Sequence, residues 1–285
     1  MTLDTSKVRL PRGHLIGLHN AKTTKGEALG WLTGIMYLAP HILSGRNVCP
    51  ASSPSCRADC LFTSGRGALP TTRDARLTRT RLYFEAREAF MQKLALEIAA
   101  LEALATEHGM RLAIRLNGTS DILWERARIT GHFAAPSLMH AFPRVRFYDY
   151  TKLHPDNRSR NRAGNYDLTF SAEAHTIDRA LEALERGWNI AAVVQPETHA
   201  RLLEGAQRAQ ANMRFHDATA HDLRFLDPPA SIGLLVPKGK LRKQTPQTST
   251  LILSEQAATH LGFAAHRRLQ RVSRFEFRGL THAEA

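Results

Sequence analysis

Short apolar runs typical of buried strands alternate with helical patterns along most of the chain, and this alternation limits the folds open to it. The first run extends from Trp31 to Leu38, and similar runs follow as RLAIRL, RFYDYT, DLTFS, IAAVV and IGLLV. Between the first two lies a segment, residues 72–108, whose apolar residues recur at three- and four-residue steps. That spacing predicts a long amphipathic helix or a broken pair of helices. Alternating strands and helices are typical of parallel βαβ units, so we predict an α/β protein with a single parallel (β/α) barrel or partial barrel.

The predicted organisation has three parts. Residues 1–20 form an N-terminal segment, residues 21–240 form the barrel-like domain with a cysteine loop at 47–67, and residues 241–285 form a polar and basic C-terminal extension. No apolar run approaches the roughly 20 residues needed to cross a bilayer. The N-terminus also lacks the apolar stretch of a secretory signal. We therefore expect a cytoplasmic protein with no membrane partner.

Polar residues gather directly after the predicted strands. The cysteine loop follows the first strand, residues 117–121 follow the second, and Asp149 ends the third. In parallel α/β barrels the loops at the carboxyl ends of the strands build the active site, so this placement predicts an enzyme. The candidate catalytic carboxylates are Asp149 and, in the later stretch HDATAHDLRFLDP, Asp217 and Asp222. A polar loop before a buried strand is the alternative interpretation of that stretch.

All three cysteines of the chain, Cys49, Cys56 and Cys60, lie in one loop with the spacing C-x6-C-x3-C. Proline, serine and aspartate around them indicate a loop and not a core segment. Three cysteines cannot all pair with one another, and a cytoplasmic protein keeps its thiols reduced, so a metal site is the main interpretation. Three thiolates would hold a 4Fe-4S cluster with one iron open to a small molecule. The alternatives are zinc, with His41 or His216 as fourth ligand, and redox-active or inert thiols.

The chain carries 39 lysines and arginines against 26 acidic residues, a formal net charge of +13. Such an excess favours a polyanionic partner, so we expect binding to nucleic acid. The residues predicted to contact it or a substrate are Arg57, Arg66, Arg73, Arg76 and Lys152. A solvated basic surface without a partner is the alternative. The phosphate-binding and dinucleotide-binding glycine motifs are absent from the sequence, which argues against ATP hydrolysis and nicotinamide chemistry.

Five stretches taken together resemble a family of phage and prophage proteins of the gene product 88 type. They are NVCPASSPSCRADCLFTSGRG, RLNGTSDILWE, FYDYTK, YDLTFS and DLRFLDP. The resemblance spans about residues 20–239 and implies a shared fold and a metal cluster, but no substrate. Leu123 stands where the family motif NGTSDIPWE has proline.

More distantly, the order of the motifs is similar to that in radical S-adenosylmethionine barrels of the spore photoproduct lyase group. In both, a cysteine loop follows the first strand and a polar turn of small residues follows the second. This resemblance implies that Asn117, Gly118, Ser120 and Asp121 bind the amino group of S-adenosylmethionine. Capping of a helix by Ser120 or Asp121 is the alternative role. The cysteine spacing departs from the C-x3-C-x2-C of that superfamily.

Two functions are consistent with these features. One is a phage-type iron–sulfur protein, an enzyme similar to the radical S-adenosylmethionine group that acts on nucleic acid or a nucleotide. The other is a zinc-stabilised, non-enzymatic nucleic-acid-binding protein that serves phage or plasmid replication. The identity of the metal at the cysteines separates the two.

Overall fold

The structure is a computed structural model that describes residues 10, 13–18, 23–158, 163–208 and 212–281, with side chains up to residue 272. Much of the predicted N-terminal segment (residues 1–9, 11–12 and 19–20) lies outside this described part. The chain forms two compact units. The first contains the residues up to Leu168 together with Ala220–Phe225, and the second contains Thr169–Thr219 and the residues from Leu226 onward.

The first unit is built on a sheet whose strands follow the order β1-β2-β3-β4-β5. Its strands are β1 (Ile16–Gly17), β2 (Trp31–Met36), β3 (Arg111–Arg115), β4 (Arg146–Thr151) and the first half of β5 (Tyr166–Ser171). Strand β1 pairs antiparallel with β2, whereas β2 with β3 and β3 with β4 are parallel. Every residue of β2 is buried, as is typical of a parallel strand covered on both faces.

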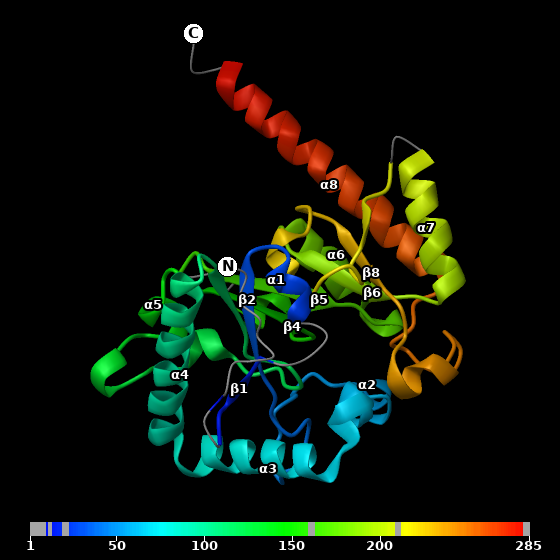
Figure 1. The fold of residues 1–285 in the computed structure, drawn as a ribbon. Helices are drawn as coiled ribbons and strands as arrows, with labels where there is room; N and C mark the ends of the chain where they lie inside the picture. Colours follow the sequence, from blue (N-terminus) through cyan, green and yellow to red (C-terminus); the bar gives the residue numbers. More distant parts are fainter. Residues whose placement is uncertain (1–9, 11–12, 19–22, 159–162, 209–211, 282–285) are drawn as a thin grey trace. The chain divides into compact units, whose positions relative to one another are not determined.

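The α-helices in the described part of the first unit are labelled in Figure 1. They are α1 (Thr24–Glu27), α2 (Pro54–Ala58), α3 (Pro70–Glu85), α4 (Arg87–Glu107) and α5 (Leu138–Ala141). The long helical pattern of the sequence forms a broken pair, because Ala86 leaves the helical conformation between α3 and α4. The buried face of α4 includes Phe90, Leu94, Ile98 and Leu101, which have the predicted spacing.

The strands of the second unit follow the order β5-β6-β8-β7, and β5 with β6, β6 with β8 and β8 with β7 are parallel. Its remaining elements are α6 (Ile177–Glu185), β6 (Asn189–Val193), α7 (Pro196–Arg208), β7 (Phe215–Asp217), β8 (Ile232–Leu235) and α8 (Glu255–Thr281). Helix α8 contacts α6 and α7 and buries Ala258, Leu261 and Ala265. Part of the predicted C-terminal extension therefore contributes to the core of this unit.

The prediction of an α/β protein with a mostly parallel sheet is confirmed. A closed barrel is not seen, because the strand pairings end at β1 and at β7. These end strands are only two and three residues long, too short to supply the continuous ladder that closure requires. In the part of the chain that the structure describes, no helix combines the length and apolarity that a bilayer demands.

Candidate functional site

The loop after β2 and the turn after β3 are hydrogen-bonded to each other in the first unit. The N–H of Gly118 donates to the carbonyl of Met36 at 3.0 Å. The N–H of Asp121 donates to the carbonyl of Val48 at 2.8 Å. Both segments begin where a parallel strand ends, so the structure brings the cysteine loop and the turn at residues 117–121 together at one edge of the sheet.

Gly118 lies where the turn crosses the end of β2. A β-carbon at this position would lie 2.6 Å from the carbonyl oxygen of Met36 and 2.6 Å from the ring of Tyr37. Only a residue without a side chain tolerates this approach. This close approach explains why residue 118 is a glycine, and no bound ligand is needed for the explanation.

Cys49, Cys56 and Cys60 are half-buried free thiols. The sulfur of Cys49 accepts a hydrogen bond from the backbone N–H of His41 at 3.3 Å and lies 3.6 Å from the carbonyl oxygen of Thr119. The pKa of Cys49 is raised to about 12, mainly by burial and also by the charges of Cys60 and Cys56, against the lowering effect of the His41 N–H. Because coulombic effects fall with distance, Cys56 and Cys60 both lie close enough to Cys49 for their charges to change its pKa.

The other two cysteines are held by local structure. Cys56 lies on α2, and its N–H donates to the hydroxyl of Ser53, which caps that helix, at 2.9 Å. Burial raises the pKa of Cys60, while the N–H of Phe62 and the charge of Arg76 lower it. Among the described residues, no three histidine, cysteine, aspartate or glutamate side chains are arranged around a single metal ion.

Asn117 organises the turn after β3. Its Oδ1 accepts hydrogen bonds from the Ser120 hydroxyl, the Ile122 N–H and the Trp124 indole, at 2.8, 2.9 and 3.0 Å. Its Nδ2 donates to the Ile122 carbonyl at 3.0 Å and to Asp149 at 3.3 Å. The amide group is therefore used within the protein, and contact of Asn117 and Ser120 with S-adenosylmethionine stays a prediction.

Arg158 is wholly buried and gathers two carboxylates. Its guanidinium lies 2.8 Å from Asp121 and 2.8 Å from Glu125, whose side chains are only 11% and 3% exposed. It also donates to the hydroxyl of Tyr166 at 2.8 Å. Asp121 in addition accepts the backbone N–H of Lys152 at 2.9 Å. The predicted ligand Asp121 thus neutralises an internal cation.

Asp149 is completely buried near the carboxyl end of β4. Its carboxylate accepts the N–H of Asn117 at 2.7 Å and the hydroxyl of Tyr166 at 2.8 Å. Burial raises the pKa of Asp149 to about 7, although Arg115 and these two donors lower it. A carboxyl group that titrates near neutral pH can both take up and release protons. Asp149 is therefore the best placed of the three predicted catalytic carboxylates.

Asp222 forms a buried ion pair with Arg115, the last residue of β3, at 2.9 Å. The hydroxyl of Tyr148 donates to the same carboxylate at 3.4 Å. Because Asp222 belongs to Ala220–Phe225, this segment brings its carboxylate into the first unit. Its contact with Arg115 suits a role in holding that cation in place.

The predicted basic contacts differ in exposure. Arg57, Arg66 and Arg73 are exposed, Lys152 is half-buried, and Arg76 is buried. Arg76 donates to the carbonyl of Phe62 at 3.3 Å. Gly67 leaves room for this contact, because a β-carbon there would lie 2.6 Å from the Phe62 oxygen and 3.1 Å from Arg76. Arg76 is thus an internal cation, and the exposed three remain candidates for a surface contact.

Asp217, the third predicted catalytic carboxylate, lies in the second unit. Its side chain is 43% exposed and lies 3.3 Å from the ring of His199. Burial by itself raises the pKa of Asp217, but hydrogen bonds from Thr219 and the contact with His199 lower it below its ordinary value. A carboxylate held ionised in this way is a poor proton donor at neutral pH.

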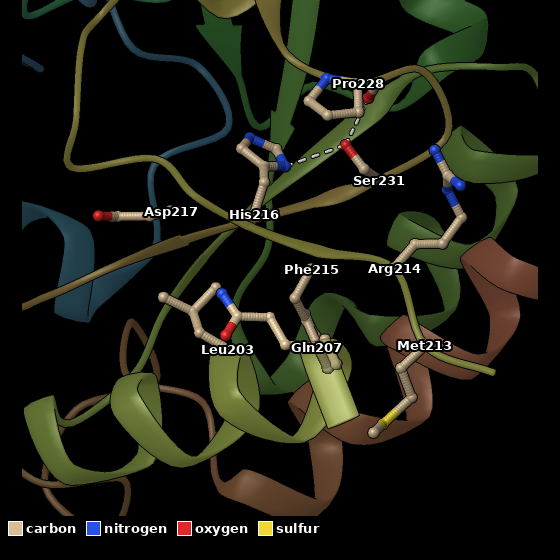
Figure 2. Close-up of a pocket in the computed structure, with 10 residues that line it drawn as sticks. Leu203, Gln207, Met213, Arg214, Phe215, His216, Asp217, Pro228 and Ser231 are labelled. Carbon is tan, nitrogen blue, oxygen red and sulfur yellow. Dashed lines mark hydrogen bonds between the residues drawn. The ribbon is translucent and has the colours of Figure 1, made fainter. Parts of the chain in front are cut away.

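Asp217 lines a pocket of about 380 Å³ in the second unit (Figure 2). Within it, His216 lies 3.0 Å from the hydroxyl of Ser231 and 3.1 Å from Asp227. Ser231, His216 and Asp227 are the residue types of a serine hydrolase triad. The Ser231 hydroxyl, however, donates to the carbonyl of Pro228, an acceptor that competes with the His216 ring for its one proton.

The described residues define a class of protein: an α/β fold with a mostly parallel sheet, in which a cysteine loop and a buried charged network lie at the carboxyl ends of the strands. The chain matches the family model described as Gene product 88 over residues 14–257. That match covers most of the 285 residues, so the protein belongs to the gene product 88 family, as the motifs predicted, and the bacteriophage assignment is confirmed. No curated protein and no solved structure matches the chain. The likeness to radical S-adenosylmethionine barrels gains no support from these comparisons.

Three residues of the buried network were not predicted from the sequence: Arg115, Arg158 and Tyr166. A signal existed for Arg115, because an arginine inside the apolar run RLAIRL needs an anionic partner once the strand is buried. Arg158 lies in the polar stretch NRSRNR, which has no apolar periodicity. Nothing in that stretch marks Arg158 as a residue that becomes buried.

Replacing Arg158 by glutamine should lower the free energy of unfolding by about 3–5 kcal/mol, because Asp121 and Glu125 would remain buried without their partner. Urea denaturation of the full chain measures the change. The matched control is Arg144→Gln. Arg144 also pairs with a glutamate but is 83% exposed, so the loss there should stay below about 1 kcal/mol. Equal losses in the two variants would contradict the role given to Arg158.

Asp149→Asn should flatten the dependence of stability on pH. The folded-state pKa of about 7 lies above the ordinary value of 3.8, so between these values the folded chain binds more protons than the unfolded chain. Stability therefore falls as the pH rises through this range. Denaturation at pH 5, 6, 7 and 8 should show a steeper fall in the wild type than in the variant. Parallel curves would show that Asp149 is ionised throughout.

Proposed function

We propose that this member of the gene product 88 family is an iron–sulfur enzyme in which Cys49, Cys56 and Cys60 bind a 4Fe-4S cluster. The main supporting observation is that the charges of Cys56 and Cys60 both act on the Cys49 thiol. The three cysteines lie in a loop that is hydrogen-bonded to the turn after β3. Asp149 and Arg115 lie at the ends of the neighbouring strands. A proton-transfer group and a cation are thus buried behind the edge of the sheet at which the cysteine loop lies.

The donor set suits a cluster better than a single zinc ion. A structural zinc ion takes four ligands around one point, with sulfur at about 2.3 Å, whereas this loop supplies three thiols. The thiolates of a cluster bind different iron atoms, so they stand farther apart. Binding would also release protons, because burial raises the pKa values of Cys49 and Cys60.

A 4Fe-4S cluster bound by three thiolates supplies an electron and leaves one iron open to a small molecule, which in this proposal is S-adenosylmethionine. The chain's own contribution is the rigid turn at residues 117–121. Because Asn117 and Asp121 are already hydrogen-bonded, ligand binding would rely on the backbone of this turn. Asp149 would hold or accept a proton at its carboxylate.

His41 is the competing fourth ligand. Its backbone N–H binds the sulfur of Cys49, and its Nδ1 is buried without a hydrogen-bond partner among the described residues. A bond from this nitrogen would close the open iron position, or complete a zinc site with three cysteines. The fate of the metal in a His41 variant therefore tests whether an open position exists.

Anaerobic reconstitution of the full chain with iron and sulfide should give a brown protein that absorbs broadly near about 400 nm and holds about four irons per chain. Cys49→Ser, Cys56→Ser and Cys60→Ser should each lose most of the iron, because no spare thiolate exists. His41→Ala is the matched control and should keep the cluster. Metal analysis and absorbance measure the outcome.

Three results would change the assignment. A colourless protein with one zinc per chain would favour the alternative, a zinc-stabilised nucleic-acid-binding protein. Loss of iron in His41→Ala would show that His41 is the fourth ligand and that no iron position is open to a small molecule. S-adenosylmethionine should bind the cluster-loaded chain and not the metal-free chain in a calorimetric titration. No binding to the loaded chain would leave the cluster as a structural or electron-carrying group.

We further propose that the substrate is a nucleic acid or a nucleotide, since exposed Arg57 and Arg66 lie in the cysteine loop. Affinity for DNA or RNA should fall steeply with rising salt, as phosphate contacts release counterions. Replacing both arginines by glutamate should flatten that dependence. The control pair, Arg111 and Arg144, is exposed at or just before the amino ends of β3 and β4, and its reversal gives the same net charge. Equal effects of the two pairs would mean that binding follows net charge alone.

A further inference from the structure

Two buried arginines lie beside Tyr37, the residue that follows β2. Arg76, on α3, has its guanidinium carbon 5.1 Å from the centre of the Tyr37 ring. The charges of Arg76 and Arg115 both act on the Tyr37 hydroxyl. Each arginine is only 6% exposed. Three different segments of the first unit thus place two cations and a phenol together at the edge where the cysteine loop lies.

These arginines have donors that the protein does not use. The Nε–H of Arg76 and the Nε–H of Arg115 are both buried without a hydrogen-bond partner among the described residues. Unmade hydrogen bonds of buried charged groups are costly, and native structures seldom keep them without a reason. Two orphaned donors, on two cations whose charges both act on Tyr37, therefore indicate that an acceptor binds beside this tyrosine.

The charges at this place do not cancel. Asp222 neutralises Arg115, but in the described part of the chain no carboxylate forms an ion pair with Arg76, and burial lowers its pKa. The titratable groups that act on Arg76 there are Tyr37 and Cys60. Burial raises the pKa of Tyr37, so its hydroxyl keeps its proton and can donate. One net positive charge and three donors suit an oxyanion.

We propose that Arg76, Arg115 and Tyr37 bind the oxyanion group, phosphate or carboxylate, of a small-molecule substrate beside the cysteine loop. The inference rests on the proposed function in that it treats this edge of the sheet as the active site. The burial of both arginines selects a small or terminal group, since the phosphates of an intact duplex backbone cannot reach donors that are nine-tenths buried. A nucleotide or another substrate with a terminal acidic group meets this condition.

The test uses the metal-free full chain, so that its outcome is independent of the cluster. Inorganic phosphate and acetate are titrated separately at constant ionic strength, with calorimetry and thermal unfolding as readouts. At least one of them should bind saturably and raise the melting temperature. Saturation by phosphate alone identifies a phosphate site, and saturation by acetate alone identifies a carboxylate site.

Variants assign the binding to these residues. Arg76→Gln should weaken it by about 10- to 100-fold and Tyr37→Phe by about 2- to 10-fold, the values for a charged and a neutral hydrogen bond. Arg73→Gln, an exposed arginine three positions earlier on α3, should leave the affinity unchanged. Arg115 is removed together with its partner, as Arg115→Gln with Asp222→Asn, to avoid a buried unpaired carboxylate. If Arg76→Gln fails to fold, Tyr37→Phe carries the test.

Two results would overturn the site: no saturable binding of either anion to the wild type, or equal weakening in Tyr37→Phe and Arg73→Gln. Failure of the proposed function has a different signature. Anion binding to a chain that takes up no iron would keep the oxyanion site and reject the cluster. If a cluster forms but the chain binds neither anion, the role of Arg76 would instead be to stabilise the neighbouring Cys60 thiolate.

Discussion

The guanidinium of Arg158 is the contact on which this edge of the first unit depends. With no exposure to solvent, its charge must be neutralised inside the protein, and Asp121 and Glu125 do so. Those residues come from the turn after β3 and from the short helix behind it, while Tyr166, which accepts from the same guanidinium, comes from β5. One cation thus holds together the turn after β3, the short helix that follows it and strand β5. The mobility of the turn beside the cysteines is limited by that cation.

The same contacts connect charge neutralisation to proton transfer. Tyr166 accepts from Arg158 and donates to Asp149, so the orientation of its hydroxyl is set on both sides. Asp149 therefore has a fixed donor at one oxygen and the Asn117 N–H at the other. Burial raises its pKa, and the fixed donors limit that rise. A network built to hold an arginine in this way also produces a carboxyl group that titrates near pH 7.

The elements that could be predicted from the sequence are those whose cause is local. The apolar run that begins at Trp31 is continuous, so a buried strand follows directly, and the spacing of Phe90, Leu94 and Ile98 predicts one face of α4. The cysteine loop is recognisable because proline and serine surround the thiols. The burial of Arg158 has no local cause, since its partner Asp121 is 37 positions away. The burial of Arg76 was not predicted for the same reason: exposure of an arginine on a helix depends on what packs against it, here Phe62 and Tyr37.

The short segment Ala220–Phe225 determines whether the first unit can be separated from the rest of the chain. It belongs to the first unit, although the chain on either side of it belongs to the second. Its Leu223 packs with Trp31, Ala113 and Tyr148, and its Asp222 neutralises Arg115. A gene fragment that stops at Leu168 would encode the cysteine loop and most of the sheet edge, yet it would leave a buried arginine without its counter-ion and a core without one of its leucines. A break in the gene at that boundary is therefore expected to destabilise the first unit, so its fold depends on a stretch of sequence encoded within the second.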